Sequence, residues 1–122
     1  MILADTSVWV DHLRAIDASM LKLLDKGRVL MHPMVVAELA LGSLRDRGKT
    51  LAVLDALRQV RVAQLDEVRQ MIETRKLYAK GIGLTDAHLL ASCLLTPGTR
   101  LWTRDDALKN VAKVLDIDAG LS

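Results

Sequence analysis

The sequence predicts an α/β fold, a sandwich of helices around a largely parallel sheet, in a single domain spanning residues 1–122. Short apolar segments of strand length alternate with longer segments of helical periodicity, and no linker, repeat or low-complexity stretch divides the chain. A chain of 122 residues is long enough for one core and short for two. Because 51% of residues are hydrophobic but only 2% aromatic, we expect an aliphatic core.

Strands are predicted where short apolar runs are bounded by turn residues or by acids. These runs lie at 2–4, 28–31, 60–63 and 100–103. Their alternation with helical segments favours parallel pairing, since a parallel pair needs a long crossover connection.

Helices are predicted where apolar residues recur at helical spacing. They are expected at 7–13, 17–24, 35–44, 51–60, 66–78, 85–95 and 105–114. Favourable N-caps precede several of them: Asp17, Asp66, Thr85 and, for the last helix, Asp105 or Asp106. Gly27 ends the second helix, and Pro33 suits the first turn of the third.

Composition bounds the cellular setting. Cys93 is the only cysteine, so no intrachain disulfide can form and a reducing compartment is expected. The N-terminus has no basic and apolar leader, and no apolar run approaches the ~20 residues that span a membrane. We therefore expect a soluble cytoplasmic protein with no membrane association.

Four carboxylates stand out by position. Asp5 and Asp105 each follow a predicted strand, and ligands bind at the carboxyl ends of parallel strands. Glu38 and Asp86 fall on apolar stripes of predicted helices, away from the face expected to meet solvent. If the two strand ends and the two helices converge, the four acids form one pocket.

Each acid also has a simpler interpretation. Asp5 and Asp105 could cap the helices that follow them. Asp86 could be a first-turn acid favoured by the helix dipole. Glu38 could form a buried salt bridge with Arg45 or with a distant arginine. Because one pocket accounts for all four acids, we expect Asp5 to bind a metal while Thr6 and Ser7 start the helix.

The residue types select the chemistry of such a pocket. Clustered carboxylates repel one another unless a cation binds, and hard oxygen ligands favour Mg²⁺ or Mn²⁺ over zinc. The histidines and Cys93 show no zinc-ligand spacing and receive no role. Neither Ser7 nor Cys93 has the surroundings of a covalent nucleophile, and no nucleotide-binding glycine loop occurs.

A carboxylate-held Mg²⁺ typically activates water for phosphodiester hydrolysis. Four of the 15 acidic residues belong to the predicted pocket, which leaves 11 acidic against 17 basic residues elsewhere. This excess of basic residues favours a polyanionic substrate. Candidates to hold it are Arg14, Arg45, Arg47, Lys49, Arg75, Lys76, Lys80 and Arg104.

Four segments in order resemble the PIN-domain nucleases, and more narrowly the VapC-type toxins of bacterial toxin–antitoxin pairs. These segments are ILADTSVW, HPMVVAELALGSL, GLTDAHLLA and LWTRDDAL, and the resemblance covers residues 2 to about 115. Each segment presents one of the four acids.

The resemblance implies a three-layer α/β/α fold with a mostly parallel sheet of about five strands. It implies a Mg²⁺-dependent endoribonuclease, with Mn²⁺ as an alternative ion, that acts on tRNA, rRNA or mRNA. It also implies a homodimer and neutralisation by a cognate antitoxin. By motif, the catalytic and metal-binding residues are Asp5, Glu38, Asp86 and Asp105, with Thr6 and Thr103 near the centre.

Two other functions remain open. A phosphate-transfer domain of the haloacid-dehalogenase or receiver type also places an aspartate at a strand end, but Ser7 occupies the position of the second acid in the dehalogenase pattern. A catalytically idle PIN-like module would only bind RNA or a partner protein. In the last segment Asp106, next to Asp105, remains an alternative fourth acid.

Overall fold

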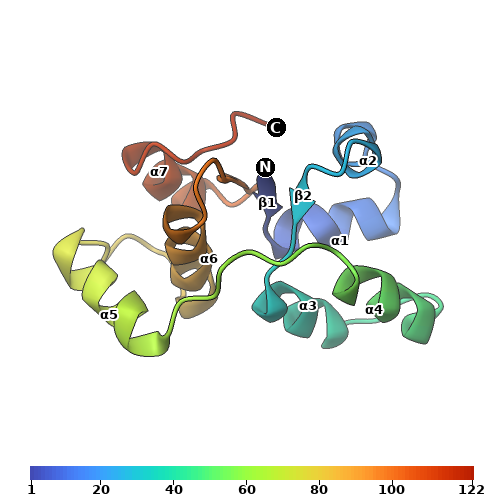
Figure 1. Ribbon diagram of the computed structural model, residues 1–122, viewed down its shortest axis with the longest axis horizontal. Coiled ribbons are helices and arrows are strands. Elements are labelled where there is room, and N and C mark those ends of the chain that lie inside the picture. The colour runs from blue at the N-terminus through green and yellow to red at the C-terminus, as the bar shows by residue number, and fades with distance from the viewer.

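Three short parallel strands form the centre of the molecule, with helices on both sides (Figure 1). The computed structural model describes residues 1–122. Helices α1 to α4 lie on one side of the strands, and α5 to α7 on the other (Figure 1). In chain order the elements are β1 (Ile2–Ala4), α1 (Thr6–Arg14), α2 (Ala18–Asp25), β2 (Val29–Leu30), α3 (Pro33–Ala40), α4 (Arg47–Asp55), α5 (Leu65–Thr74), α6 (Leu84–Leu95), β3 (Arg100–Trp102) and α7 (Asp106–Val114).

The sheet has the strand order β2-β1-β3, and both pairings are parallel. It is narrower than the expected five strands. Single parallel bridges extend it on each side, Met31 with Gln59 beyond β2 and Leu101 with Asp118 beyond β3. The predicted strand at 60–63 is wrong. After Val60 the chain leaves the sheet, because the Arg61 amide donates to the Thr96 hydroxyl, 3.1 Å away, instead of to a strand.

All seven predicted helices form, and tertiary contacts shift several of their ends. Helix α3 ends at Ala40 instead of continuing to residue 44. The Arg47 guanidinium donates hydrogen bonds to the carbonyls of Ala40 and Gly42, at 2.5 and 3.1 Å, and so satisfies the open end of the helix. Helix α4 accordingly covers Arg47–Asp55 instead of 51–60.

Helices α5 and α6 each start one or two residues earlier than predicted. An acid in the third helical position closes each start. The Gln64 amide donates to Glu67, and the Gly83 amide donates to Asp86. Helix α5 ends at Thr74 instead of residue 78.

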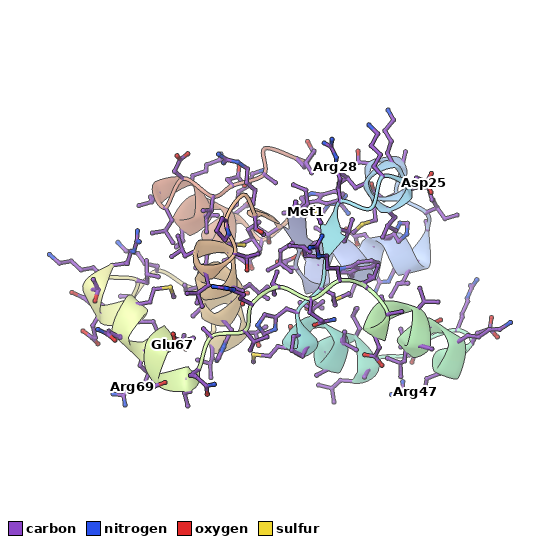
Figure 2. The ribbon with its side chains drawn as sticks, viewed as in Figure 1. Met1, Asp25, Arg28, Arg47, Glu67 and Arg69 are labelled. Atoms are coloured by element: carbon purple, nitrogen blue, oxygen red, sulfur yellow. The ribbon has the colours of Figure 1, made fainter.

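The core is aliphatic, as the composition predicts, with two tryptophans added. Leu3, Leu90 and Leu101 have no exposed surface, and Trp9 and Trp102 are buried beside them. Charged side chains such as Asp25, Glu67 and Arg69 lie at the periphery (Figure 2). None of the helices has both the length and the apolar character needed to cross a membrane.

The topology fixes where a ligand site should lie. The chain goes from β1 to β2 on one side of β1 and later returns to β3 on the other side. Ligand sites in open α/β sheets lie at the carboxyl ends of the strands flanking such a reversal. Here those ends are adjacent, since the Asp5 amide donates to the Trp102 carbonyl at 2.9 Å.

Candidate active site

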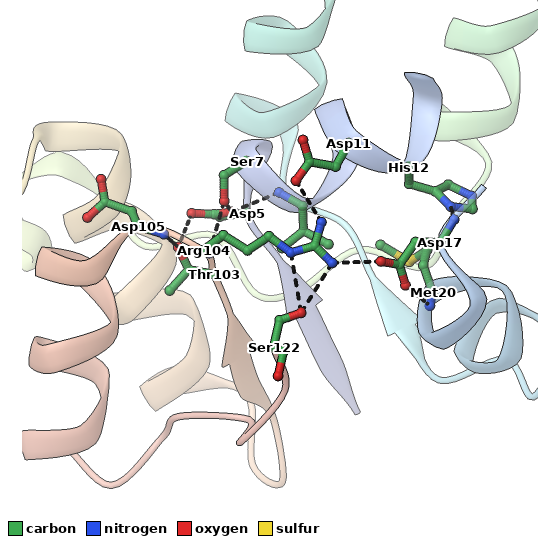
Figure 3. Close-up of polar contacts among 11 residues, drawn as sticks. Asp5, Ser7, Asp11, His12, Asp17, Met20, Thr103, Arg104, Asp105 and Ser122 are labelled. Carbon is green, nitrogen blue, oxygen red and sulfur yellow. Dashed lines mark hydrogen bonds and ion pairs between the residues drawn. The ribbon is translucent and has the colours of Figure 1, made fainter. Parts of the chain in front are cut away.

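Asp5 lies at the carboxyl end of β1, as predicted, and is only 5% exposed. One carboxylate oxygen accepts from the Ser7 hydroxyl at 2.5 Å and the Val8 amide at 3.3 Å, while the other accepts from the Thr103 hydroxyl at 2.5 Å (Figure 3). Asp5 is therefore the N-cap of α1. The expectation that it leaves the helix start to its neighbours is wrong: the carboxylate is held in place by the same bonds that start the helix.

Two hydroxyls connect Asp5 to the turn between β3 and α7. Thr103 donates to Asp5 and accepts from the Asp105 amide at 3.0 Å. Ser7 donates to Asp5 and accepts from the Arg104 amide at 3.1 Å. These bonds fix residues about 97 positions apart in the sequence at one edge of the sheet.

Asp105 follows β3 and caps α7, accepting from the Leu108 amide at 2.9 Å. Its other carboxylate oxygen has no hydrogen bond within the protein. Asp106 is the first residue of α7 and is exposed. Both side chains are exposed, and Asp105 differs in that its amide donates to the Thr103 hydroxyl, which in turn donates to Asp5.

Glu38 lies on α3 with an exposed side chain, so its predicted place on an apolar face is wrong. The short helix buries Val35 and Leu39 and leaves Glu38 at the edge. One Glu38 oxygen accepts from the Thr6 hydroxyl at 2.7 Å. The alternative of a buried salt bridge with Arg45 is also wrong, because the only ion pairs in the structure are those of Arg104.

Asp86 lies in the first turn of α6, half-buried, where it accepts from the Gly83 amide at 3.0 Å. Burial raises the pKa of this carboxyl, and the negative charges of Asp105, Asp5 and Glu38 raise it further, against the lowering effect of the Gly83 bond. The other three predicted acids therefore lie near enough to Asp86 to act on its carboxyl electrostatically. This is the clearest sign that they share one region of the molecule.

The donor set suits a hard divalent cation. No three histidine, cysteine or acidic side chains are arranged to hold a metal ion. Carboxylate oxygens of Asp5, Asp86 and Asp105 accept from amide and hydroxyl donors. Glu38, Asp86 and Asp105 each keep one oxygen without a protein hydrogen bond. Oxygen ligands of this kind fit Mg²⁺ or Mn²⁺.

The raised pKa of Asp86 gives a stability prediction. A carboxyl whose folded pKa is raised binds protons more readily when folded, so its ionisation destabilises the fold as the pH rises above about 4. In EDTA at pH 7 we expect Asp86→Asn to raise the melting temperature by on the order of 2 °C, a difference that shrinks toward pH 3.

With added Mg²⁺, the wild type should have the higher melting temperature of the two proteins. The ion should raise the melting temperature of the wild type more than that of Asp86→Asn, because a ligand stabilises the state that binds it. Equal shifts in a thermal scan would show that Asp86 is only a helix-end acid.

Arg104 is used differently from its predicted role as a polyanion contact. Its guanidinium pairs with Asp11 at 2.7 Å and Asp17 at 2.6 Å and donates to the Ser122 carbonyl (Figure 3). The guanidinium carbon also lies 5.5 Å from the centroid of the Trp102 ring. The sequence analysis predicted neither the ion pairs of Arg104 nor the bridging hydrogen bonds of Ser7. Only the spacing of Ser7 two residues after a strand-end aspartate could have indicated its part.

The remaining titratable groups stay outside the site. His32 is fully buried, caps α3 by accepting from the Met34 amide, and has its pKa lowered to about 4 by burial and by the charge of His88. Burial raises the pKa of the Cys93 thiol to about 12. A thiol that remains protonated is a poor nucleophile, which agrees with the sequence-based exclusion of Cys93.

An α/β fold with carboxylates at the reversal between β1 and β3 agrees with what comparison with known proteins shows. The family model of the PIN domain matches residues 2–114, and the chain belongs to that family. It is similar to the proteins named Ribonuclease VapC32 of two Mycobacterium tuberculosis strains, CDC 1551 / Oshkosh and ATCC 25618 / H37Rv. Each is 49% identical over 109 residues, covering 89% of this chain and 88% of the relative.

Proposed function

We propose that the protein is a VapC-type toxin, an endoribonuclease of a toxin–antitoxin pair, folded as a single PIN-like domain over residues 1–122. The observation that carries the proposal is the position of Asp5 at the carboxyl end of β1, where Thr103 donates to its carboxylate and accepts from the Asp105 amide after β3. The extensive similarity to proteins named as ribonucleases supports it. The substrate is RNA, with tRNA, rRNA and mRNA as the candidate classes.

In this proposal Asp5, Glu38, Asp86 and Asp105 hold Mg²⁺ or Mn²⁺. An ion held by these carboxylates would supply an activated water and a positive charge beside the phosphate. The protein supplies orientation. Ser7 and Thr103 keep the Asp5 carboxylate from rotating, and Thr6 fixes one oxygen of Glu38.

The elevated pKa of Asp86 also has a consequence for binding. Repulsion among the four carboxylates costs free energy in the absence of a cation, and a bound divalent cation relieves it. The four acids thus favour binding of a divalent cation. Partners that follow from the proposal are a cognate antitoxin and a second copy of the chain, in the cytoplasm.

RNA cleavage by the purified, antitoxin-free protein tests the proposal. We expect an RNA substrate to be cut with Mg²⁺ or Mn²⁺, cleavage to stop with excess EDTA, and activity to return when Mg²⁺ is restored. Gel analysis of end-labelled RNA measures the products. Asp5→Asn purified in parallel controls for contaminating nucleases.

Cleavage that persists in EDTA would contradict the metal-dependent mechanism. RNA binding without any cleavage in either metal would favour the idle PIN-like module instead.

A further inference from the structure

A cavity of about 670 Å³ lies between α1, α3 and the start of α4. Figure 1 shows α1 running across α3 and α4 on the same side of the sheet. Glu38 forms part of the cavity wall, and Glu38 is also the acid that accepts from Thr6 at the start of α1. The cavity therefore has one of the four predicted acids in its wall. A chain bound across the acids would reach directly into it.

The floor of the cavity is aliphatic. Val10 and Leu13 contribute from α1, Leu39 from α3, and Leu44 from the loop before α4. The loop is held in shape by the Thr50 hydroxyl, which donates to the Arg45 carbonyl at 2.7 Å. A volume of this size falls in the range of about 300–1,000 Å³ typical of small-molecule sites, and an aliphatic floor can cover the flat face of a base.

Two arginines on the cavity wall give it a positive rim. Arg14 and Arg45 are exposed, and neither guanidinium forms an ion pair or a hydrogen bond with the protein. By contrast, Arg47 is bound to the end of α3 and Arg104 to its two aspartates. Free guanidinium groups beside an apolar floor match a phosphate attached to a base.

We propose that this α1–α3 cavity holds the base of an RNA nucleotide that flanks the scissile phosphate, with Arg14 and Arg45 contacting the adjacent phosphates. The inference rests on the proposed ribonuclease function and adds a specificity subsite to it. An apolar protein segment is the competing occupant. RNA is favoured because an apolar segment would leave both guanidinium groups unpaired at the interface.

The first test measures binding apart from cleavage. Arg14→Ala and Arg45→Ala are made in the Asp5→Asn protein, and the affinity for a fluorescent single-stranded RNA is measured by anisotropy in EDTA over a series of salt concentrations. We expect each change to weaken binding by roughly 10-fold and to reduce the slope of log Kd against log salt by about 1. Arg69→Ala, an exposed arginine on α5, is the matched control and should leave the affinity unchanged.

The second test locates the base. RNA carrying 4-thiouridine is crosslinked to the Asp5→Asn protein, and the modified peptides are identified by mass spectrometry. We expect crosslinks in α1 and in residues 39–50. Crosslinks confined to other segments, or an unchanged affinity of both arginine variants, would overturn the proposal and leave a protein segment as the occupant.

Kinetics separate failure of the subsite from failure of the function. In the otherwise wild-type protein, Arg14→Ala and Arg45→Ala should raise KM with little change in kcat, because they bind substrate away from the reacting phosphate. Wild-type KM values would exclude the subsite while leaving the ribonuclease intact. If the arginine variants bind RNA more weakly but the wild-type protein never cleaves RNA, the RNA-binding subsite is supported and the ribonuclease function is excluded.

Discussion

Asp5→Asn is expected to abolish RNA cleavage and to relieve growth arrest while the protein still folds. Asparagine has the same shape and can still accept from the Val8 amide, so the start of α1 is preserved. What is lost is the negative charge of Asp5 and one of the two oxygens that accept from Ser7 and Thr103. We expect a loss in kcat of at least about 100-fold, the scale on which one charge-stabilising group acts in an active site.

A matched pair of variants in the last segment serves as the control for Asp5→Asn. Asp105→Asn should also lose activity, whereas Asp106→Asn should behave as wild type, because Asp105 follows β3 and hydrogen-bonds Thr103 through its amide, while Asp106 is the first residue of α7. Cleavage rates and melting temperatures measured side by side would decide this. Retained activity in Asp5→Asn would remove Asp5 from the site.

Thr103→Val is expected to impair both stability and activity. The change keeps the shape of the side chain but removes the hydroxyl that donates to the buried Asp5 carboxylate and accepts from the Asp105 amide. A buried charge that loses a donor costs about 2 kcal/mol of folding stability, and loss of a residue that orients a ligand costs about 10-fold to 100-fold in activity. Urea denaturation and cleavage rates measure the two effects.

Thr103→Ser provides the control, since it keeps the hydroxyl and removes only a methyl group. It should regain most of the activity that Thr103→Val loses. If Thr103→Val cleaves RNA at the wild-type rate, the hydrogen bond from Thr103 does not orient Asp5 for catalysis.

The features predicted correctly from the sequence depend on local signals. The strand at residues 2–4, the N-cap Asp17 and the position of Asp105 after a strand all follow from residues within a few positions of one another. The strand-end placement of Asp5 follows in the same way. Such features are determined by backbone preferences and short-range hydrogen bonds, which a single sequence displays directly.

The features predicted incorrectly depend on contacts between distant segments. Helix α3 ends early because Arg47 reaches back to its last carbonyls. Helix α3 buries Val35 and Leu39 and leaves Glu38 exposed. The hydrogen bond that Glu38 accepts comes from Thr6, 32 positions away in the sequence. Arg104 pairs with Asp17 and Asp11, which lie 87 and 93 positions away in the sequence. No local sequence pattern therefore indicates that Arg104 forms ion pairs within the protein instead of contacting substrate.

Three of the four acids begin helices: Asp5 caps α1, Asp105 caps α7, and Asp86 closes the first turn of α6. Substitutions that abolish the proposed toxicity should therefore differ in how much they destabilise the fold. Replacement by alanine removes the charge and also a helix start worth about 1 kcal/mol. Replacement by asparagine removes the charge but keeps an oxygen that can accept at the helix start, with the further loss of one hydroxyl hydrogen bond at Asp5. Inactive lineages that keep a folded protein, still able to bind a partner, should carry asparagine at these positions more often than alanine.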